Sequence, residues 1–425
     1  MNFEITIDEL GVRGDGIGRL PDGRRCFVPG ALPGEVVRVS LARERAGGVA
    51  DQLTKILKKS ANRIDPPCVY FGKCGGCALQ HMKAEIYTAF KVNRVKTAMV
   101  QAGLPPDVIK GIHTSPPGTR RRAVLSAKCG ADGIVEVGFN ERASHRLVMI
   151  ESCAVLTPAL VDKLSSFRRF LPEIMQPGES YDLALTEVMG RVEALITVLG
   201  TAQKRLYPQA KEVLAQLAEH ADLARLYWRE NGLSEPQTVI HRAEFTAGFE
   251  KFKVALPPGA FLQATEAGQK TLTETVAKWA KKSRHLADLY AGCGTFSLSL
   301  LAQGHSVDAF EGDRAAIEAL AQAGKGQARL KTARRDLARE PLTFQELKAY
   351  DTVVMDPPRV GAKEQAAELT RSAVPCVIGV SCNPSTFARD GAILCAGGYR
   401  LKEVQIVDQF LWSPHVELAG LFVRE

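Results

Sequence analysis

The sequence predicts a multi-domain protein with a small N-terminal β-barrel, a central α+β domain and a C-terminal doubly wound α/β domain. Three observations support this division. Short strands separated by glycine and proline turns fill residues 1–60, and alternating, hairpin-like stretches dominate residues 61–256. From residue 257 to residue 425, strands alternate with helices, which is typical of a parallel sheet covered by helices.

The composition limits the function classes. The chain of 425 residues carries a formal net charge of +8, with arginine clusters at residues 120–122, 168–169 and 334–335, which favours a polyanionic partner. No apolar run is long enough to cross a membrane, and the first residues lack the features of a signal peptide. We therefore expect a cytoplasmic protein without a membrane segment, acting as a monomer. In such a protein, ten cysteines indicate metal binding or catalysis more than disulfides.

The N-terminal segment contains five expected strands, at residues 4–9, 18–20, 25–28, 35–41 and 50–57. Glycines and Pro-Gly pairs separate them. Five short strands in this length are typical of an OB-like barrel, a common nucleic-acid binder, although another small barrel such as an SH3-like one remains open. Basic side chains that could contact phosphates are Arg43, Arg45, Lys55, Lys58 and Lys59.

A cysteine cluster follows the first domain. Cys68, Cys74 and Cys77 lie within ten residues, and two glycines between the last two let the backbone turn tightly. This pattern predicts a metal site that needs a fourth ligand from elsewhere. Cys129 and Cys153 are candidates, with His81 as an alternative for zinc.

The central domain is expected to contain helices at residues 83–102 and 202–220. Its strands are expected at residues 121–128, 134–140, 181–188, 191–199, 223–228 and 238–242. The third and fourth strands form a hairpin about Met189-Gly190. The Arg120–Arg122 triplet is the best candidate here for a nucleic-acid contact, and a solvated charge run is the alternative.

The C-terminal domain carries a cofactor pattern. After an expected strand at 285–290 comes Gly292-x-Gly294, where the backbone can approach a ligand closely, and Glu311 ends the next strand at 306–310. A dinucleotide fingerprint would have a third glycine where Ser297 stands. Together with Asp356-Pro-Pro after a later strand, the pattern favours a Rossmann-like domain that uses S-adenosylmethionine to transfer a methyl group.

A candidate nucleophile follows another expected strand, at residues 377–381. Cys382 comes directly after it, and Asn383-Pro384 then imposes a turn. The carboxyl ends of the strands are the edge where open α/β sheets bind ligands. The alternative is a buried structural cysteine, which is the commoner role for an isolated one.

Five segments in order resemble the RNA (uracil-5)-methyltransferase family. They are Phe261-Leu-Gln263, residues 288–296, Asp356-Pro-Pro-Arg359, Ser381-Cys-Asn-Pro384 and His415-Val-Glu417. The N-terminal segment resembles a TRAM domain through its Gly-rich opening at residues 10–18 and through residues 27–35. A TRAM domain combined with a cysteine cluster is similar to the RlmD-type subgroup, which methylates 23S rRNA.

The resemblance implies a class I S-adenosylmethionine-dependent enzyme and a set of site residues. The residues expected around the cofactor are Gln263, Tyr290, Thr295, Glu311, Asp336 and Asp356. The residues expected to bind a [4Fe-4S] cluster are Cys68, Cys74, Cys77 and Cys153. Thr295 departs from the asparagine frequent in the family, and Asp336 could instead cap a helix.

The implied chemistry needs one thiolate and one base. Carbon 5 of uracil becomes nucleophilic when a thiolate adds at carbon 6, and a base must later remove the proton from carbon 5. Cys382 is expected as the nucleophile and Glu417 as the base, the alternative for Glu417 being an exposed carboxylate at a sheet edge. Leu411 and Pro414 depart from the family's pattern before the base. The target base must leave its stack, with Phe261, Tyr290 or Phe410 as stacking partners.

Three other functions compete with this prediction. The same chemistry could act on tRNA, or the chain could be a non-catalytic RNA-binding assembly factor with a methyltransferase-like fold. Cytosine-5 methylation is less compatible, because those enzymes have a cysteine where this chain has Arg359.

Overall fold

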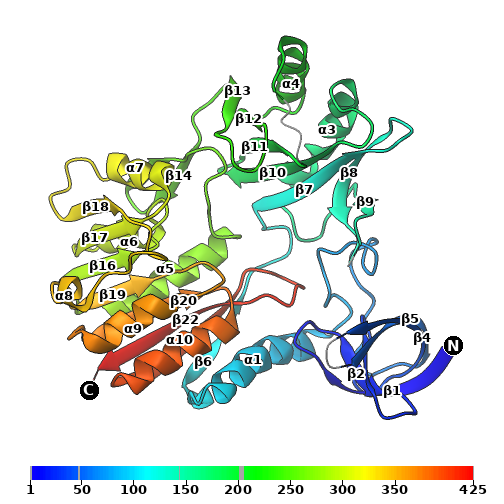
Figure 1. Cartoon of the computed structure of the whole chain (residues 1–425), viewed down its shortest axis with the longest axis horizontal. Coiled ribbons are helices and arrows are strands. Elements are labelled where there is room, and N and C mark those ends of the chain that lie inside the picture. Colours follow the sequence, from blue (N-terminus) through cyan, green and yellow to red (C-terminus); the bar gives the residue numbers. More distant parts are fainter. Residues whose placement is uncertain (1, 46–47, 143, 201–204, 425) are drawn as a thin grey trace.

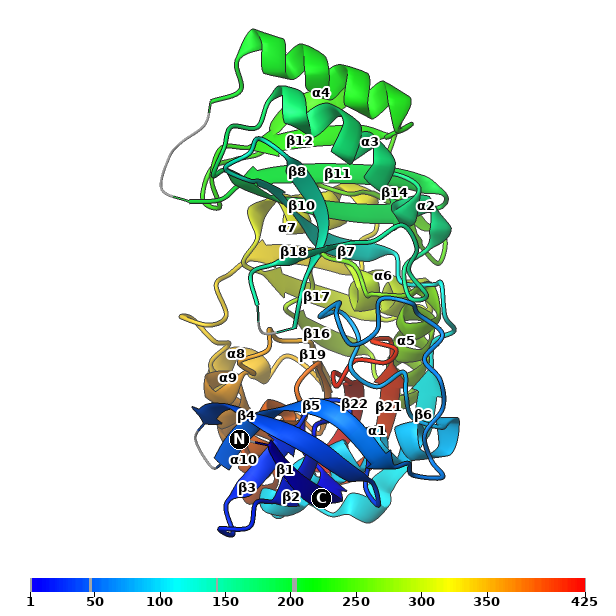
Figure 2. The same cartoon turned by 90° about the vertical axis from the view of Figure 1, so that its right-hand side faces the viewer.

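The computed structural model describes residues 2–45, 48–142, 144–200 and 205–424, without the side chains of residues 41–52. Figures 1 and 2 show three parts: the N-terminal barrel, the sheet of the central domain with its helices, and the large C-terminal sheet. The predicted phosphate contacts of Arg43 and Arg45 lie outside the described side chains.

The N-terminal part is a closed five-stranded barrel in the order β1-β2-β3-β5-β4. Its strands are β1 (Asn2–Leu10), β2 (Gly16–Arg19), β3 (Arg25–Val28), β4 (Val36–Arg45) and β5 (Gly48–Lys58). Gly18 is required where β2 crosses β1, because a Cβ there would lie 2.3 Å from the backbone oxygen of Thr6. The barrel predicted from the glycine-punctuated strands is therefore present.

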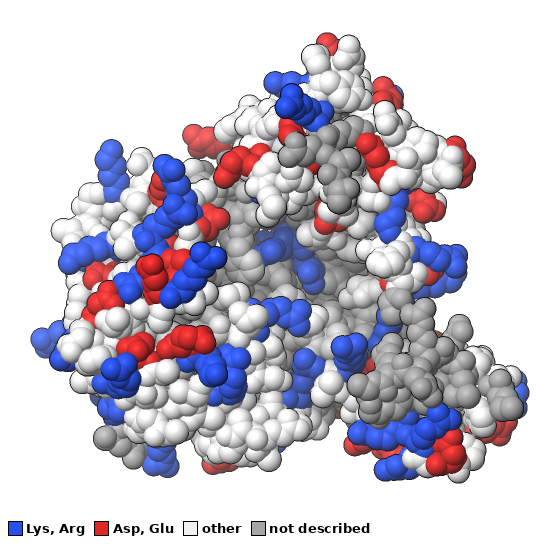
Figure 3. All heavy atoms as spheres, in the orientation of Figure 1, with Lys and Arg blue, Asp and Glu red and all other residues white. Residues whose placement is uncertain are grey.

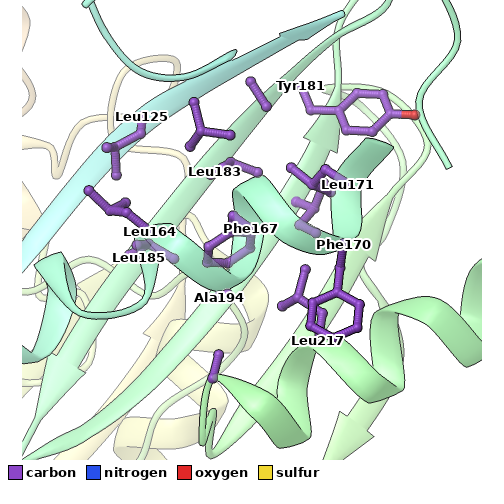
Figure 4. Packing of buried hydrophobic residues seen from close by; sticks show 14 of the residues in the cluster. Leu125, Leu164, Phe167, Phe170, Leu171, Tyr181, Leu183, Leu185, Ala194 and Leu217 are labelled. Atoms are coloured by element: carbon purple, nitrogen blue, oxygen red, sulfur yellow. The ribbon is translucent and has the colours of Figure 1, made fainter. Parts of the chain in front are cut away.

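The central part is a seven-stranded sheet in the order β13-β12-β11-β10-β7-β8-β9. Its strands are β7 (Arg122–Cys129), β8 (Val135–Asn140), β9 (Leu147–Met149), β10 (Ser180–Val188), β11 (Arg191–Val198), β12 (Arg225–Arg229) and β13 (Gln237–His241). Helices pack their apolar sides against it through Leu164, Phe167, Phe170 and Leu217 (Figure 4). These helices are α2 (Pro158–Val161), α3 (Leu164–Phe170), followed by the 3₁₀ turn η2 (Leu171–Glu173), and α4 (Pro208–His220).

The C-terminal part is an eight-stranded sheet in the order β18-β17-β16-β19-β20-β22-β21-β6. Its strands are β6 (Ile109–Thr114), β16 (His285–Leu289), β17 (Ser306–Glu311), β18 (Leu330–Arg334), β19 (Thr352–Met355), β20 (Cys376–Ser381), β21 (Tyr399–Asp408) and β22 (Glu417–Arg424). Five neighbouring strands, from β18 to β20, are parallel, and β22 is antiparallel to both of its neighbours. A hairpin and six helices accompany it: β14 (Thr246–Phe249), β15 (Phe252–Ala255), α5 (Glu266–Ala280), α6 (Thr295–Ala302), α7 (Arg314–Ala323), α8 (Phe344–Leu347), α9 (Lys363–Arg371) and α10 (Pro384–Ala396).

One segment departs from the predicted domain division. Helix α1 (Ala84–Gln101), the 3₁₀ turn η1 (Pro106–Val108) and β6 were placed with the central domain, but β6 pairs in parallel with β21 at the edge of the C-terminal sheet. Val95 and Met99 of α1 are buried in the core of that same sheet. Pairing with a distant strand, rather than position in the chain, decides where this segment belongs.

The second predicted helix of the central domain also differs. It was expected at residues 202–220, of which 202–204 lie outside the described residues, and the helix begins at Pro208. Proline is well suited to the first position of a helix, because its fixed φ angle matches and it needs no hydrogen-bond acceptor there. Among the described residues, no helix is long and apolar enough to cross a membrane.

Candidate active site

The ends of the parallel strands carry most of the predicted site residues. Tyr290 follows β16, Glu311 ends β17, Asp356 follows β19 and Cys382 follows β20. Because parallel strands share one carboxyl edge, these side chains meet at a cavity of about 570 Å³. We call it the carboxylate cavity; its lining includes Phe261, Gln263, Tyr290, Gly292, Thr295, Glu311, Asp336, Asp356, Arg359, Cys382 and Glu417.

The glycine turn shapes one wall of the carboxylate cavity. Tyr290, Gly292 and Gly294 have φ angles of 62°, 55° and 97°, a region that L-residues other than glycine rarely adopt. The backbone N–H of Gly292 donates to Glu311 Oε2 over 2.9 Å, and that of Asp313 donates to Oε1 over 2.8 Å. These bonds fix the Glu311 carboxylate beside the turn.

The remaining predicted cofactor residues also reach this cavity. Thr295 is the first residue of α6, immediately after the turn. Asp336 lies in the turn after β18, where its Oδ1 accepts a hydrogen bond from the backbone N–H of Ala338. Asp336 therefore closes a turn and does not start a helix.

Two carboxyl groups face the inner end of the cavity. Glu417 is 3% exposed at the first position of β22, which excludes the alternative of an exposed edge carboxylate. Burial and the nearby Asp356 raise the pKa of Glu417 well above its usual range. Burial also raises the pKa of Asp356 to about 7. Mutual repulsion in a poorly solvated site disfavours ionisation of both groups together.

The Cys382 thiol lies at the same end of the cavity. Burial, Glu417 and Asp356 raise the pKa of this thiol to about 11, while the Arg359 guanidinium acts in the opposite direction. The sequence alone did not indicate the direction in which the pKa of Cys382 is shifted. The cavity by itself therefore holds Cys382 as a thiol at neutral pH.

A buried amide network connects the two carboxyl groups. Gln409 donates from Nε2 to Gln263 Oε1 over 2.6 Å and to Glu417 Oε2 over 3.0 Å. Gln263 Nε2 donates in turn to Asp356 Oδ2 over 3.2 Å. Sequence reasoning named the neighbouring Phe410 as a stacking candidate but missed Gln409.

Helix α1 anchors the loop that precedes Glu417. Lys91 is fully buried, and its Nζ donates to Asp408 Oδ1 over 2.7 Å and to the backbone oxygen of His415. The Tyr87 hydroxyl bonds to Asp408 and accepts from the backbone N–H of Trp412. No local sequence signal indicates these contacts, because more than 300 residues separate the partners.

A second cavity, of about 370 Å³, contains the predicted metal ligands. We call it the thiol cavity; its lining includes Cys68, Cys74, Cys77, Arg120, Cys153, Phe410, Leu411, Ser413 and His415. Burial, together with the neighbouring thiols of Cys153, Cys74 and Cys68, raises the pKa of Cys77 to about 12. All four cysteines expected in one site are thus close enough to influence one another electrostatically.

The other predicted ligands lie elsewhere. Cys129 is buried in the core of the central sheet, and the His81 ring packs against Phe71 with its centroid 5.4 Å away. Among the described residues, no three His, Cys, Asp or Glu side chains converge closely enough to bind a single metal ion. The four thiols share a cavity without meeting at one point.

The Arg120–Arg122 triplet is partly buried and is not a solvated charge run, while its contact with nucleic acid stays a prediction. Arg121 is 5% exposed, and it donates to the backbone oxygen of Gln263 and to Gln269 Oε1. Arg122 lies over the ring of the exposed Phe261, and Arg120 lies over that of Phe410. Arg121 thus connects the start of β7 to residues 263–269, while Arg120 lines the thiol cavity and Arg122 packs on Phe261, which lines the carboxylate cavity.

The molecule is hollowed between its three parts. Figure 3 shows Lys and Arg side chains on the walls of this hollow. On the barrel, Lys55, Lys58 and Lys59 are exposed as predicted. Positive charge around a concave surface is complementary to a polyanion.

Comparison with known proteins adds family information. Residues 331–425 match the tRNA (Uracil-5-)-methyltransferase family, and residues 2–45 match the TRAM domain. A tRNA (uracil-54, C5)-methyltransferase from Pyrococcus abyssi, solved with S-adenosyl-L-homocysteine, has the same fold over 100% of both chains, with a TM-score of 0.75 and 23% identity.

Two relatives align over almost the whole chain. An uncharacterized RNA methyltransferase of Mesorhizobium japonicum is 40% identical over 99% of this chain and 98% of its own length. The 23S rRNA (uracil(1939)-C(5))-methyltransferase RlmD of Halomonas elongata is 32% identical over 97% of this chain and 88% of its own length. At this identity and coverage, the chain belongs to the family of S-adenosylmethionine-dependent RNA (uracil-5)-methyltransferases.

Proposed function

We propose that this enzyme methylates carbon 5 of a specific uridine in 23S rRNA, with Cys382 as the nucleophile and Glu417 as the base. The observation that carries the proposal is the meeting of one thiol and two carboxyl groups in the carboxylate cavity. The 23S rRNA substrate is supported by the relative from Halomonas elongata, which is named for uracil 1939 of that RNA.

In the proposed mechanism, Cys382 activates the uracil ring. Its thiolate bonds to carbon 6 of the uracil, and the electrons of the ring double bond move toward the carbonyl oxygen at position 4. Carbon 5 then becomes nucleophilic enough to accept a methyl group. The pKa of about 11 means that the thiolate is a minor form, roughly one part in 10⁴ at pH 7, until bound substrates change the field around it.

Glu417 completes the reaction. Once carbon 5 carries the methyl group, its proton moves to the carboxylate, the C5–H electron pair restores the ring double bond, and the C6–S bond breaks. Cys382 leaves as the thiolate. A raised pKa suits this role, because it makes the Glu417 carboxylate a stronger proton acceptor.

The carboxylate cavity fits S-adenosylmethionine, which supplies the methyl group as a sulfonium cation. Glu311, Asp336, Asp356 and Glu417 line the cavity, whereas Arg359 is the only guanidinium in its described lining. A site with this charge balance attracts a cation. Glu311, held at the strand tip beside the glycine turn, is positioned to accept hydrogen bonds from a ribose.

We further infer that the thiol cavity holds a [4Fe-4S] cluster on Cys68, Cys74, Cys77 and Cys153. Four thiols without an acidic side chain in the described lining suit iron–sulfur chemistry. Their failure to converge on a single point also fits, since each thiolate of such a cluster binds a different iron atom. Anaerobically purified protein should contain iron and sulfide, and Cys77→Ser should lose both; protein that contains zinc instead would contradict this assignment.

The substrate is tested with two kinds of unmodified RNA. One is a 23S rRNA fragment that contains the uridine for which the relative is named, and the other is a full set of tRNAs. Labelled methyl groups should enter the fragment and appear as 5-methyluridine by mass spectrometry. Methylation of tRNA alone would show that the substrate assignment is wrong. With the fragment, Glu417→Gln should accumulate a covalent protein–RNA adduct, and its absence would contradict the role of Glu417.

A further inference from the structure

Gln409 is buried between the two carboxyl groups of the active site, yet the mechanism above gives it no task. It directly follows β21, is 1% exposed and carries no charge. Its side-chain amide nevertheless uses both of its polar atoms on residues that line or approach the carboxylate cavity.

One contact fixes the direction of the whole network. The backbone N–H of Ala264 can only donate, so the atom of Gln409 that it meets over 2.8 Å must be the carbonyl oxygen. The amide nitrogen of Gln409 therefore faces Gln263 and Glu417, and it must donate to both. Gln263 then receives this bond on its oxygen, which leaves its own amide nitrogen facing Asp356.

Close packing leaves the Gln409 side chain little freedom. A Cβ added at Gly268 of α5 would lie 2.8 Å from the Cβ of Gln409 and 3.1 Å from its Oε1. The helix can lie this close only because residue 268 has no side chain. The amide is thus fixed by packing on one side and by three hydrogen bonds on the others.

We propose that Gln409 is the positioning residue for proton abstraction: it ties back Glu417 Oε2 so that Oε1 faces carbon 5 of the uracil. This inference rests on the proposed role of Glu417 as the base. Oε1 of Glu417 accepts no hydrogen bond from the described residues. It is also not among the fully buried polar atoms that lack a partner, so it is accessible from the cavity that Glu417 lines. The carbon 5 proton moves to Oε1, while Oε2 keeps its bond to Gln409.

The same bond assists ionisation. A donor favours the charged form of a carboxyl group, and Gln409 therefore opposes the effects of burial and of Asp356, which raise the pKa of Glu417. Removing the donor should raise this pKa further. Since the base must be ionised to accept a proton, the acidic limb of the pH–rate profile should move to higher pH.

The test compares Gln409→Met and Gln409→Glu with Glu417→Gln and the wild type in single-turnover reactions. Methionine has a similar length but cannot form the bonds, whereas glutamate keeps an acceptor for Ala264 and has no donor when it is ionised. Release of tritium from RNA labelled at carbon 5 of uridine measures proton abstraction. Denaturing gels measure the covalent adduct, and titration with S-adenosylhomocysteine measures the cofactor site.

Both Gln409 variants should release tritium about 10- to 100-fold more slowly, less than the full loss of about 10²- to 10⁴-fold expected when a general base is removed. The acidic limb of the pH–rate profile should move to higher pH by about one to two units in both variants. The shift should be larger in Gln409→Glu than in Gln409→Met. Adduct should accumulate in both, with affinity for S-adenosylhomocysteine and KM for RNA within about two-fold of wild type.

The matched control is Gln405→Met, because Gln405 lies on β21 and bonds to the backbone oxygens of Gly111 and Ile406, away from the cavity. It should retain the wild-type profile. Wild-type tritium release and a wild-type acidic limb in both Gln409 variants, with adduct accumulating in Glu417→Gln, would overturn the positioning role and leave the base assignment intact. If Glu417→Gln accumulates no adduct, both assignments are overturned.

Discussion

The carboxylate cavity and the thiol cavity receive side chains from the same segment, residues 409–417, but they place cysteine in opposite surroundings. In the carboxylate cavity, one thiol faces Asp356 and Glu417. In the thiol cavity, four cysteines lie together with the Arg120 guanidinium close to Cys77 and Cys153. The first arrangement places Cys382 against carboxyl groups, and the second places four cysteines near one another.

The comparison indicates that, under the proposed roles, the neighbours of a cysteine distinguish nucleophile from ligand more clearly than its own pKa does. Cys382 and Cys77 both have a pKa raised far above neutrality. For Cys382, the neighbouring charges are carboxylates that bound substrates can offset. For Cys77, they are other thiols, whose joint ionisation needs a cation such as iron. The following predictions test this contrast, from the largest expected effect to the smallest.

The largest effect is expected from removing the reactive thiol. Cys382→Ala should lower methylation by about 10⁴-fold or more, as expected when a covalent nucleophile is lost. The matched control is Cys376→Ala, because Cys376 begins the strand that Cys382 follows and has a pKa raised to the same value, about 11. It should retain activity. Equal loss of methylation in both variants would show that the activity depends on the packing of this strand and not on the position of the Cys382 thiol in the cavity.

The next effect concerns the anchoring of residues 409–417, which contribute to both cavities, by helix α1. Lys91→Met leaves Asp408 buried without its charge partner, which typically costs about 3–5 kcal/mol in the free energy of unfolding. Chemical denaturation should measure this loss. Lys96→Met on the exposed side of the same helix is the control and should change the stability by less than about 0.5 kcal/mol. A similar small change in Lys91→Met would contradict the anchoring role of α1.

A smaller effect is expected on the ionisation of Cys382. Asp356 raises the pKa of this thiol, so Asp356→Asn should lower it, and alkylation by iodoacetamide should begin at a pH about one unit lower. Mass spectrometry of the modified peptide measures the rate at each pH. Cys376 provides an internal control, because its pKa is raised by burial and Asp351 and should not respond. An unchanged pH dependence of alkylation at Cys382 would show that Asp356 does not control the ionisation of this thiol.

The sequence predicted the parts of the site that follow local rules. Cys382, Asp356 and Glu311 each stand where an apolar strand ends, and parallel strands bring such positions together whatever the details of packing. The motif before Glu417 similarly indicated a base, and its burial agrees with that interpretation. Residue type and position relative to a strand were sufficient for Cys382, Asp356 and Glu311, whereas the prediction for Glu417 rested on the family resemblance.

The contacts that orient the site were not predictable in this way. Gln409 meets Gln263 across 146 residues, and Lys91 meets Asp408 across 317. A glutamine or a lysine in a helix or loop has no local signature of such a partner, because either is equally compatible with solvent. The same reason explains the misplaced β6, since nothing local in its sequence identifies β21 as its neighbour.

The pairing of β6 with β21 has a consequence during protein synthesis. Gly111 and Gln405, which meet across these strands, are 294 residues apart. At about 5–20 residues per second, a ribosome needs roughly 15–60 s between making the first strand and making its partner. During this time β6 and the apolar side of α1 have no sheet to join, so the nascent chain exposes them. The enzyme that acts on RNA therefore depends, for its own assembly, on translation having passed β21.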